Sequence, residues 1–185
     1  GDGPSLPNPS DNLADLKAIV IDTTVPTILR VTSTTPDGTY GLGASVNIQV
    51  VFSEAVSLAG GNLQVALNTG VTVSIAPFTA QTVVNGTYTV GAGQSTSDLN
   101  ATSPLTLSAG TLRDLAGNTA VRTIPSTQNI ANLKAIVIAG GPLPPTNIRV
   151  TVYATAVDIE WDPSPSPAAQ LAGYNVYRRA PGGAW

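Results

Sequence analysis

The sequence predicts an all-β protein made of antiparallel β-sandwiches, and three observations support this prediction. Threonine accounts for 23 of the 185 residues, which is more than all the charged residues together. Long helices favour Ala, Leu, Glu and Lys, whereas this chain is rich in Val, Ile and Thr. Short segments in which apolar and polar residues alternate are separated by turns rich in Gly and Pro, as expected for many short strands.

Period-two alternation predicts the strands of one complete unit over residues 24–139. The alternating apolar positions are Val46, Ile48, Val50 and Phe52; Leu63, Val65 and Leu67; Val71, Val73 and Ile75; Val84, Tyr88 and Val90; Leu105 and Leu107; Leu112; Val121 and Thr123; and Leu133, Ala135 and Val137. Asn85-Gly86 is a turn or bulge signal inside this series. Seven or more short strands over about 115 residues indicate an antiparallel sandwich.

A nine-residue repeat flanks this unit. Residues 13–21 read LADLKAIVI and residues 130–138 read IANLKAIVI, so that seven of nine positions are identical at an offset of 117 residues. A repeat at this spacing indicates a tandem array in which each unit ends in the same strand. We therefore expect residues 13–23 to be the closing strand of a preceding unit or an extra edge strand, after a flexible leader at residues 1–12.

A second β pattern follows a linker that is rich in Pro and Gly, at residues 140–145. Ile148, Val150 and Val152 alternate, and so do Val157, Ile159 and Trp161. These positions predict that residues 146–185 are the N-terminal half of a second sandwich.

Half a sandwich lacks the sheet that would cover its apolar side chains. Two explanations are open: the natural polypeptide continues beyond this sequence, or a neighbouring copy completes the sheet by strand addition. The candidate interface residues are Leu16, Ala18 and Val20 in the first closing strand, and Val157, Ile159, Trp161, Tyr174 and Val176 in the half-domain.

Several segments of residues 13–139 resemble the bacterial Ig-like repeats of large secreted and surface proteins of the adhesin type. They are Pro36–Gly43 (PDGTYGLG), Val51–Val56 (VFSEAV), Ser97–Leu99 (SDL), Gly110–Asn118 (GTLRDLAGN), and the closing strand Lys17–Asp22 with its linker Thr23–Pro26. The resemblance implies an immunoglobulin-like sandwich and an extracellular or cell-surface location.

The segment from Pro144 resembles the first half of a fibronectin type III domain. Three stretches carry the resemblance: Pro145–Ile148, Val157–Trp161 and Gly173–Arg178. It implies that these are the first three strands of such a domain, whose later strands the sequence does not contain.

The composition excludes several classes of function. Without cysteine there is no disulfide or thiolate metal site, and without histidine there is no nucleophile–histidine pair. A net charge of −3 with only 8 basic residues argues against a nucleic-acid partner. Catalysis by a carboxylate pair needs two acidic groups close together. The two glutamates, Glu54 and Glu160, lie in different modules, so we expect no enzyme active site. No stretch at the N-terminus resembles a transmembrane segment, and we expect no membrane insertion.

The loop from Asp114 to Asn118 (DLAGN) is the most site-like motif in the chain. Its Asp and Asn offer oxygen ligands suited to Ca²⁺, and its glycine permits a tight turn. Asp22, Glu54 and Asp98 are further candidate ligands if the fold brings them near. The alternative is that Asp114 and Asn118 only hydrogen-bond the backbone of their own turn.

We therefore expect a non-enzymatic structural or spacer module of an extracellular multidomain surface protein. Other copies of the chain, or neighbouring modules, are the expected partners, and a fibre, sheath or layer is the expected assembly. The alternative is an adhesin or a carbohydrate-binding accessory module of a secreted enzyme, in which Tyr40, Tyr153, Tyr177 and Trp185 are the aromatic candidates for stacking on a polysaccharide.

Overall fold

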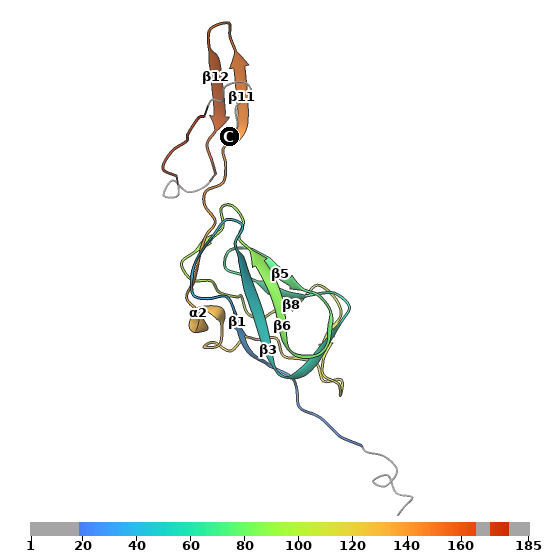
Figure 1. Ribbon diagram of the computed structural model, residues 1–185. Helices are drawn as coiled ribbons and strands as arrows, with labels where there is room; N and C mark the ends of the chain where they lie inside the picture. Colours follow the sequence, from blue (N-terminus) through green and yellow to red (C-terminus); the bar gives the residue numbers. More distant parts are fainter. Residues whose placement is uncertain (1–18, 166–170, 178–185) are drawn as a thin grey trace, which may run out of the picture.

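A computed structural model describes residues 19–165 and 171–177 of the chain. It contains a β-sandwich with a separate β-hairpin beyond one end (Figure 1). The chain enters the sandwich at one end and leaves it at the opposite end, on the side of the hairpin. The prediction of an all-β fold with antiparallel sheets is confirmed.

The first layer of the sandwich is organised around one long strand, β3 (Ser45–Ala59). It pairs antiparallel with β1 (Ile28–Thr32) on one side and with β6 (Phe78–Thr89) on the other. Short β9 (Thr111–Arg113) pairs with the last three residues of β3. The predicted alternation at Val46–Phe52 lies inside β3, which continues further than the pattern indicates.

Two smaller sheets form the facing layer. One has the order β5 (Thr72–Ile75), β4 (Leu63–Ala66), β8 (Thr106–Leu107), and all of its pairs are antiparallel. The other places β10 (Ile136–Ala139) between β2 (Gly38–Gly41) and β7 (Ser95–Thr96). β10 runs parallel to β2 and antiparallel to β7.

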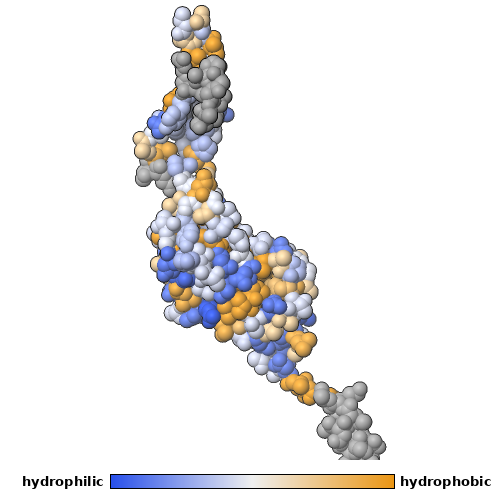
Figure 2. Space-filling view, viewed as in Figure 1, coloured by the Kyte–Doolittle hydropathy of each residue, from blue (hydrophilic) through white to orange (hydrophobic). Residues whose placement is uncertain are grey.

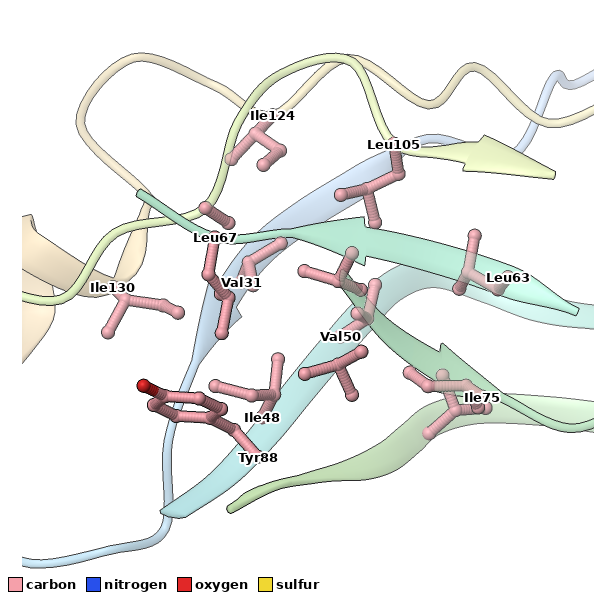
Figure 3. Close-up of a cluster of buried hydrophobic side chains, with 14 of the residues drawn as sticks. Val31, Ile48, Val50, Leu63, Leu67, Ile75, Tyr88, Leu105, Ile124 and Ile130 are labelled. Atoms are coloured by element: carbon pink, nitrogen blue, oxygen red, sulfur yellow. The ribbon is translucent and has the colours of Figure 1, made fainter. Parts of the chain in front are cut away.

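The core lies between these layers and is almost purely apolar (Figure 3). Ile48 and Val50 of β3 meet Leu63 of β4 and Ile75 of β5, and all four side chains are at most 5% exposed. Tyr88 is 1% exposed and keeps its hydroxyl satisfied by donating to Gln94 Oε1 across 2.7 Å. Each buried aliphatic side chain of this kind contributes about 1.5–3 kcal/mol, so packing is the main source of stability.

Asn85-Gly86 does not form a turn. Both residues lie within β6, opposite Gln49 and Ile48 of β3. A Cβ atom on Gly86 would lie 2.5 Å from Cγ1 of Val73 in β5. The glycine therefore permits close approach of the two layers.

The predicted phase of the closing strand is wrong. Ile136 and Ile138 are the buried side chains of β10, at 0% and 2% exposure. Leu133 is exposed and ends the one-turn helix α2 (Ile130–Leu133), while Val137 is half-buried. Because nearly every position of the segment is apolar, alternation alone could not select the inward face.

Two other expected elements differ from the structure. Val121 and Thr123 lie in no strand, and Val121 makes only an isolated parallel bridge to Thr27. β2 occupies a Gly-rich stretch for which the alternation predicted no strand. It forms because its backbone pairs with β10, which comes almost a hundred residues later.

Beyond the linker, β11 (Thr146–Val152) and β12 (Val157–Asp162) form an antiparallel hairpin. Residues 171–177, which include most of the expected third strand, lie in no strand. Tyr174 nevertheless packs edge-on against Trp161, with ring centroids 5.6 Å apart. Its hydroxyl oxygen accepts a hydrogen bond from the backbone N–H of Ser164 across 2.6 Å.

The N-terminal closing strand falls only partly within the described residues. Residues 19–26 lead into β1 and lie in no strand. Leu16 and Ala18 lie outside the described residues, as does the leader at residues 1–12.

Candidate metal centre

Three carboxylates converge where the chain enters the sandwich. One oxygen from each of Asp22, Glu54 and Asp114 lies within 4.8 Å of the others. These are three of the five calcium candidates that the sequence suggested, and they come from positions far apart in the chain. Among the described residues, none of the three forms an ion pair.

The sheet explains why these side chains meet. Glu54 lies in β3, in the stretch where the register with β6 is interrupted between Val51 and Val56. β9 pairs with β3 just beyond this stretch, and Asp114 is the residue that follows β9. Asp22 reaches the same place from the segment that precedes β1.

The DLAGN turn is held by hydrogen bonds around Asp114, which is only 8% exposed. Asp114 Oδ1 accepts the backbone N–H of Asn118 across 2.8 Å, and Oδ2 accepts the Asn118 side-chain N–H, also across 2.8 Å. The backbone N–H of Asp114 also donates to the Asn118 oxygen across 3.1 Å, and the Gly117 N–H donates to the Asp114 oxygen across 3.4 Å. Gly117, at φ +98°, adopts the left-handed conformation that the turn needs.

The same Asn118 amide also donates to the backbone carbonyl of Asp22 across 3.1 Å. The Asn118 side-chain nitrogen therefore links the turn to the incoming chain, because it donates both to the Asp114 carboxylate and to the Asp22 backbone oxygen. Asn118 thus hydrogen-bonds within its own turn, as the alternative to calcium binding expected. Its side-chain amide also joins this turn to Asp22.

The protein environment shifts the pKa values of two of the carboxyls in opposite directions. Burial raises the pKa of Glu54 above its ordinary 4.5, and the negative charges of Asp22 and Asp114 raise it further. Burial also opposes ionisation of Asp114, but hydrogen bonds from Asn118, Gly117 and Ala116 outweigh it and lower the pKa of Asp114 below 3.8. Near neutral pH the cluster therefore concentrates negative charge, and the repulsion from Asp22 and Asp114 opposes ionisation of Glu54.

A divalent cation would neutralise this repulsion. Carboxylate oxygens are the ligands that Ca²⁺ prefers, and Asp22, Glu54 and Asp114 offer three such groups. Asp98, the other candidate, is not a member of this group. Its side-chain Oδ1 is buried and has no hydrogen-bond partner among the described residues.

The candidate interface residues of the hairpin line a separate groove. Ile159, Trp161, Tyr174 and Val176 contribute to an open groove of about 290 Å³. Val157 is 58% exposed and does not line it. At the other end of the sandwich, Val20 is 87% exposed and lies beside Leu115 of the DLAGN turn.

The aromatic candidates for sugar stacking do not form one site. Tyr40 donates its hydroxyl proton to the backbone oxygen of Pro36, at the sandwich. Tyr153 and Tyr177 are exposed on the hairpin side, and only Tyr177 lines the groove. Trp185 lies outside the described residues.

Two features of this turn could not be read from the sequence pattern. One is that the backbone N–H groups of Ala116 and Gly117 are partners of Asp114. The other is that Leu115, which precedes them, is fully exposed. An Asp followed by Gly-Asn was the available signal, since such residues form side-chain-to-backbone turns.

A comparison of the chain with known protein families, curated protein sequences and solved structures finds no match. The resemblances to bacterial Ig-like repeats and to fibronectin type III domains therefore stay predictions from the sequence. Within the described part of the chain, no helix is long and apolar enough to cross a membrane.

Proposed function

We propose that this chain is a non-enzymatic structural module of an extracellular, multidomain surface protein, where it serves as a spacer in an array of similar modules. The repeat at residues 13–21 and 130–138 supports an array, because it places the same closing sequence before and after the sandwich. The fibre, sheath or layer expected from the sequence is the assembly such modules would build.

One observation supports a load-bearing role most directly. The last strand of the sandwich, β10, runs parallel to β2, which lies near its beginning, and the chain enters and leaves at opposite ends (Figure 1). Tension applied along the chain therefore loads the β2–β10 ladder in shear. All of its hydrogen bonds then resist together, whereas a ladder pulled open from one end loses them one after another.

A single-molecule pulling experiment tests this role. The chain has no cysteine, so two introduced cysteines give unique attachment points. Handles at Thr24→Cys and Pro142→Cys would load β2 and β10 in shear. Handles at Leu42→Cys and Pro142→Cys lie at the same end of the two parallel strands and would unzip them. We expect a clearly higher unfolding force for the first pair, and equal forces would overturn the mechanical role.

Calcium at the carboxylate cluster would serve the same role. Asp22 belongs to the incoming chain, while Glu54 and Asp114 belong to the sandwich. An ion that bound all three would clamp the incoming segment against the body of the module. This proposal is supported by the distance between the carboxylates and by the raised pKa of Glu54.

The hairpin groove favours a second candidate function, which is binding of a polysaccharide by an adhesin or an accessory module. Trp161, Tyr174 and Tyr177 line the groove, and flat rings of this kind stack on sugars. A ligand that binds the folded state raises its stability by mass action. A panel of glycans that leaves the melting temperature unchanged would exclude this function.

A further inference from the structure

The N-terminal segment repeats the whole β10 region, including its buried polar residue. Asn129 and Asn12 precede the nine-residue repeat at corresponding positions, so that residues 12–21 (NLADLKAIVI) match residues 129–138 (NIANLKAIVI). In the described copy, Asn129 is 9% exposed and caps α2. Its side-chain amide accepts the backbone N–H of Ala101 across 3.3 Å and donates to the Ala101 oxygen across 2.7 Å.

The rest of the described copy occupies a slot between β2 and β7. Ile136 and Ile138 bury their side chains there, at 0% and 2% exposure. The backbone pairs with β2 over residues 136–139 and with β7 over residues 138–139. Further bonds join Gly38 N–H to the Ala135 oxygen across 3.0 Å and Leu99 N–H to the Ile136 oxygen across 2.8 Å.

The N-terminal copy has an identical or similar residue at each of these buried positions. Asn12, Ile19 and Ile21 match the anchoring Asn129 and the two buried isoleucines, and Leu13 replaces buried Ile130. The one change of residue class, Asp15 for Asn132, falls at an exposed position. A closing strand is thus present twice, but the sandwich has one slot for it.

In the described part of the N-terminal copy, the two isoleucines have no such cover. Ile19 is 62% exposed and Ile21 is 86% exposed, whereas their counterparts in β10 are buried. Figure 2 shows hydrophobic surface on this segment, at the lower end of the view. We propose that residues 12–21 are a closing strand for the β2–β7 slot of a second copy of this sandwich, which they fill when that slot is open.

The residues that follow each copy explain which strand holds the slot in the intact sandwich. Gly140 follows β10, and a Cβ atom at this position would lie 2.1 Å from the Gly91 oxygen. The N-terminal copy has Thr23 at the corresponding position, so it must leave the slot one residue earlier. β10 also has the advantage of belonging to the same chain, which gives it a high effective concentration.

The proposal deepens the role of the chain as a unit of an array, on which it rests, because it names the strand that links one unit to the next. The test uses the full chain with Ile136→Asp and Ile138→Asp, which exclude β10 from its own slot. We expect this variant to stay folded by circular dichroism and to have the mass of two or more copies by light scattering. Addition of Ile19→Asp and Ile21→Asp should abolish both the folding and the association.

Val20→Asp is the matched control, because Val20 corresponds to half-buried Val137 rather than to a core position. In the β10 double variant this control should leave the association intact. The proposal fails if the double variant is monomeric, whether folded or unfolded, or if association persists after Ile19 and Ile21 are changed. The pulling experiment concerns only the intact sandwich, so failure of one test is distinguishable from failure of the other.

Discussion

The side chain of Asn118 donates a hydrogen bond to the backbone oxygen of Asp22 across 3.1 Å, although the two residues lie 96 positions apart. This bond ties the incoming chain to the turn that holds Asp114. Both ends of the carboxylate cluster are therefore positioned by one amide group, and the first predictions concern this cluster.

Calcium should raise the melting temperature of the chain, and a chelator should reverse the rise. The physical reason is that an ion which binds only the folded state stabilises it by mass action. Differential scanning calorimetry with Ca²⁺, with Mg²⁺ and with a chelator measures the effect. Identical melting curves in all three conditions would exclude a structural calcium ion.

Glu54→Gln should raise the melting temperature in the absence of calcium at neutral pH and should abolish the response to calcium. The substitution removes the carboxylate whose pKa is raised by burial and by Asp22 and Asp114, and with it a ligand. Glu160→Gln on the hairpin is the matched control, because Glu160 pairs with Arg149 and is remote from the cluster. A loss of stability in Glu54→Gln without calcium would contradict the electrostatic argument.

Stability without calcium should rise as the pH falls from neutral toward 4.5, the ordinary pKa of the Glu54 carboxyl. The pKa of Glu54 is raised in the folded state, so the folded chain binds this proton at a pH above the ordinary value of 4.5. Asp114 acts in the opposite sense, because its lowered pKa stabilises the fold above pH 3.8 and that contribution is lost only at still lower pH. Urea denaturation at several pH values tests the order of these events, and Glu54→Gln should flatten the rise above pH 4.5.

Gly86→Ala should destabilise the sandwich by about 1–3 kcal/mol, the usual cost of overpacking a core. The new methyl group would meet Val73 at 2.5 Å and Ile75 at 3.0 Å. Gly41→Ala is the control, since its methyl group would lie 3.7 Å from the nearest atom, the Ala139 oxygen. Denaturant unfolding of the two variants should separate them, and equal stabilities would show that β5 and β6 can move apart freely.

Tryptophan fluorescence should report an earlier transition than far-ultraviolet circular dichroism during denaturation. Both tryptophans, Trp161 and Trp185, follow the linker, so this signal reports the C-terminal region rather than the sandwich. The hairpin has little buried surface: Ile148, Val150 and Val152 are 61%, 58% and 73% exposed. Coincident transitions would instead show that the hairpin and the sandwich unfold as one cooperative unit.

The strands that could be predicted from sequence are those with one buried and one open face. β3, β4 and β5 have clear alternation, and the positions predicted to be buried within them are buried. Val71, which precedes β5, is only partly buried. β10 has apolar residues on both faces, so its phase was read one residue out of step. β2 (GTYG) shows no alternation of apolar and polar side chains. It forms through parallel backbone pairing with a distant strand, which local sequence does not reveal.

For the candidate site, the sequence predicted which residue types could bind an ion but not which of them lie close together. Asp114, Asn118, Asp22 and Glu54 could be proposed as ligands from their chemistry, but their proximity depends on how β9 and the incoming segment lie against β3. The sequence also gave no indication that Asp98 lies outside this group or that Asn118 points its nitrogen toward the acids.

The exit from the sandwich is held by main-chain groups. Gly140 N–H donates to the Gln94 oxygen across 2.9 Å, and Gly93 N–H donates to the Gly141 oxygen across 2.8 Å. A direction set in this way is insensitive to most changes of side chain. The exposed side chains of such a module can therefore change while the path by which the chain leaves it stays the same.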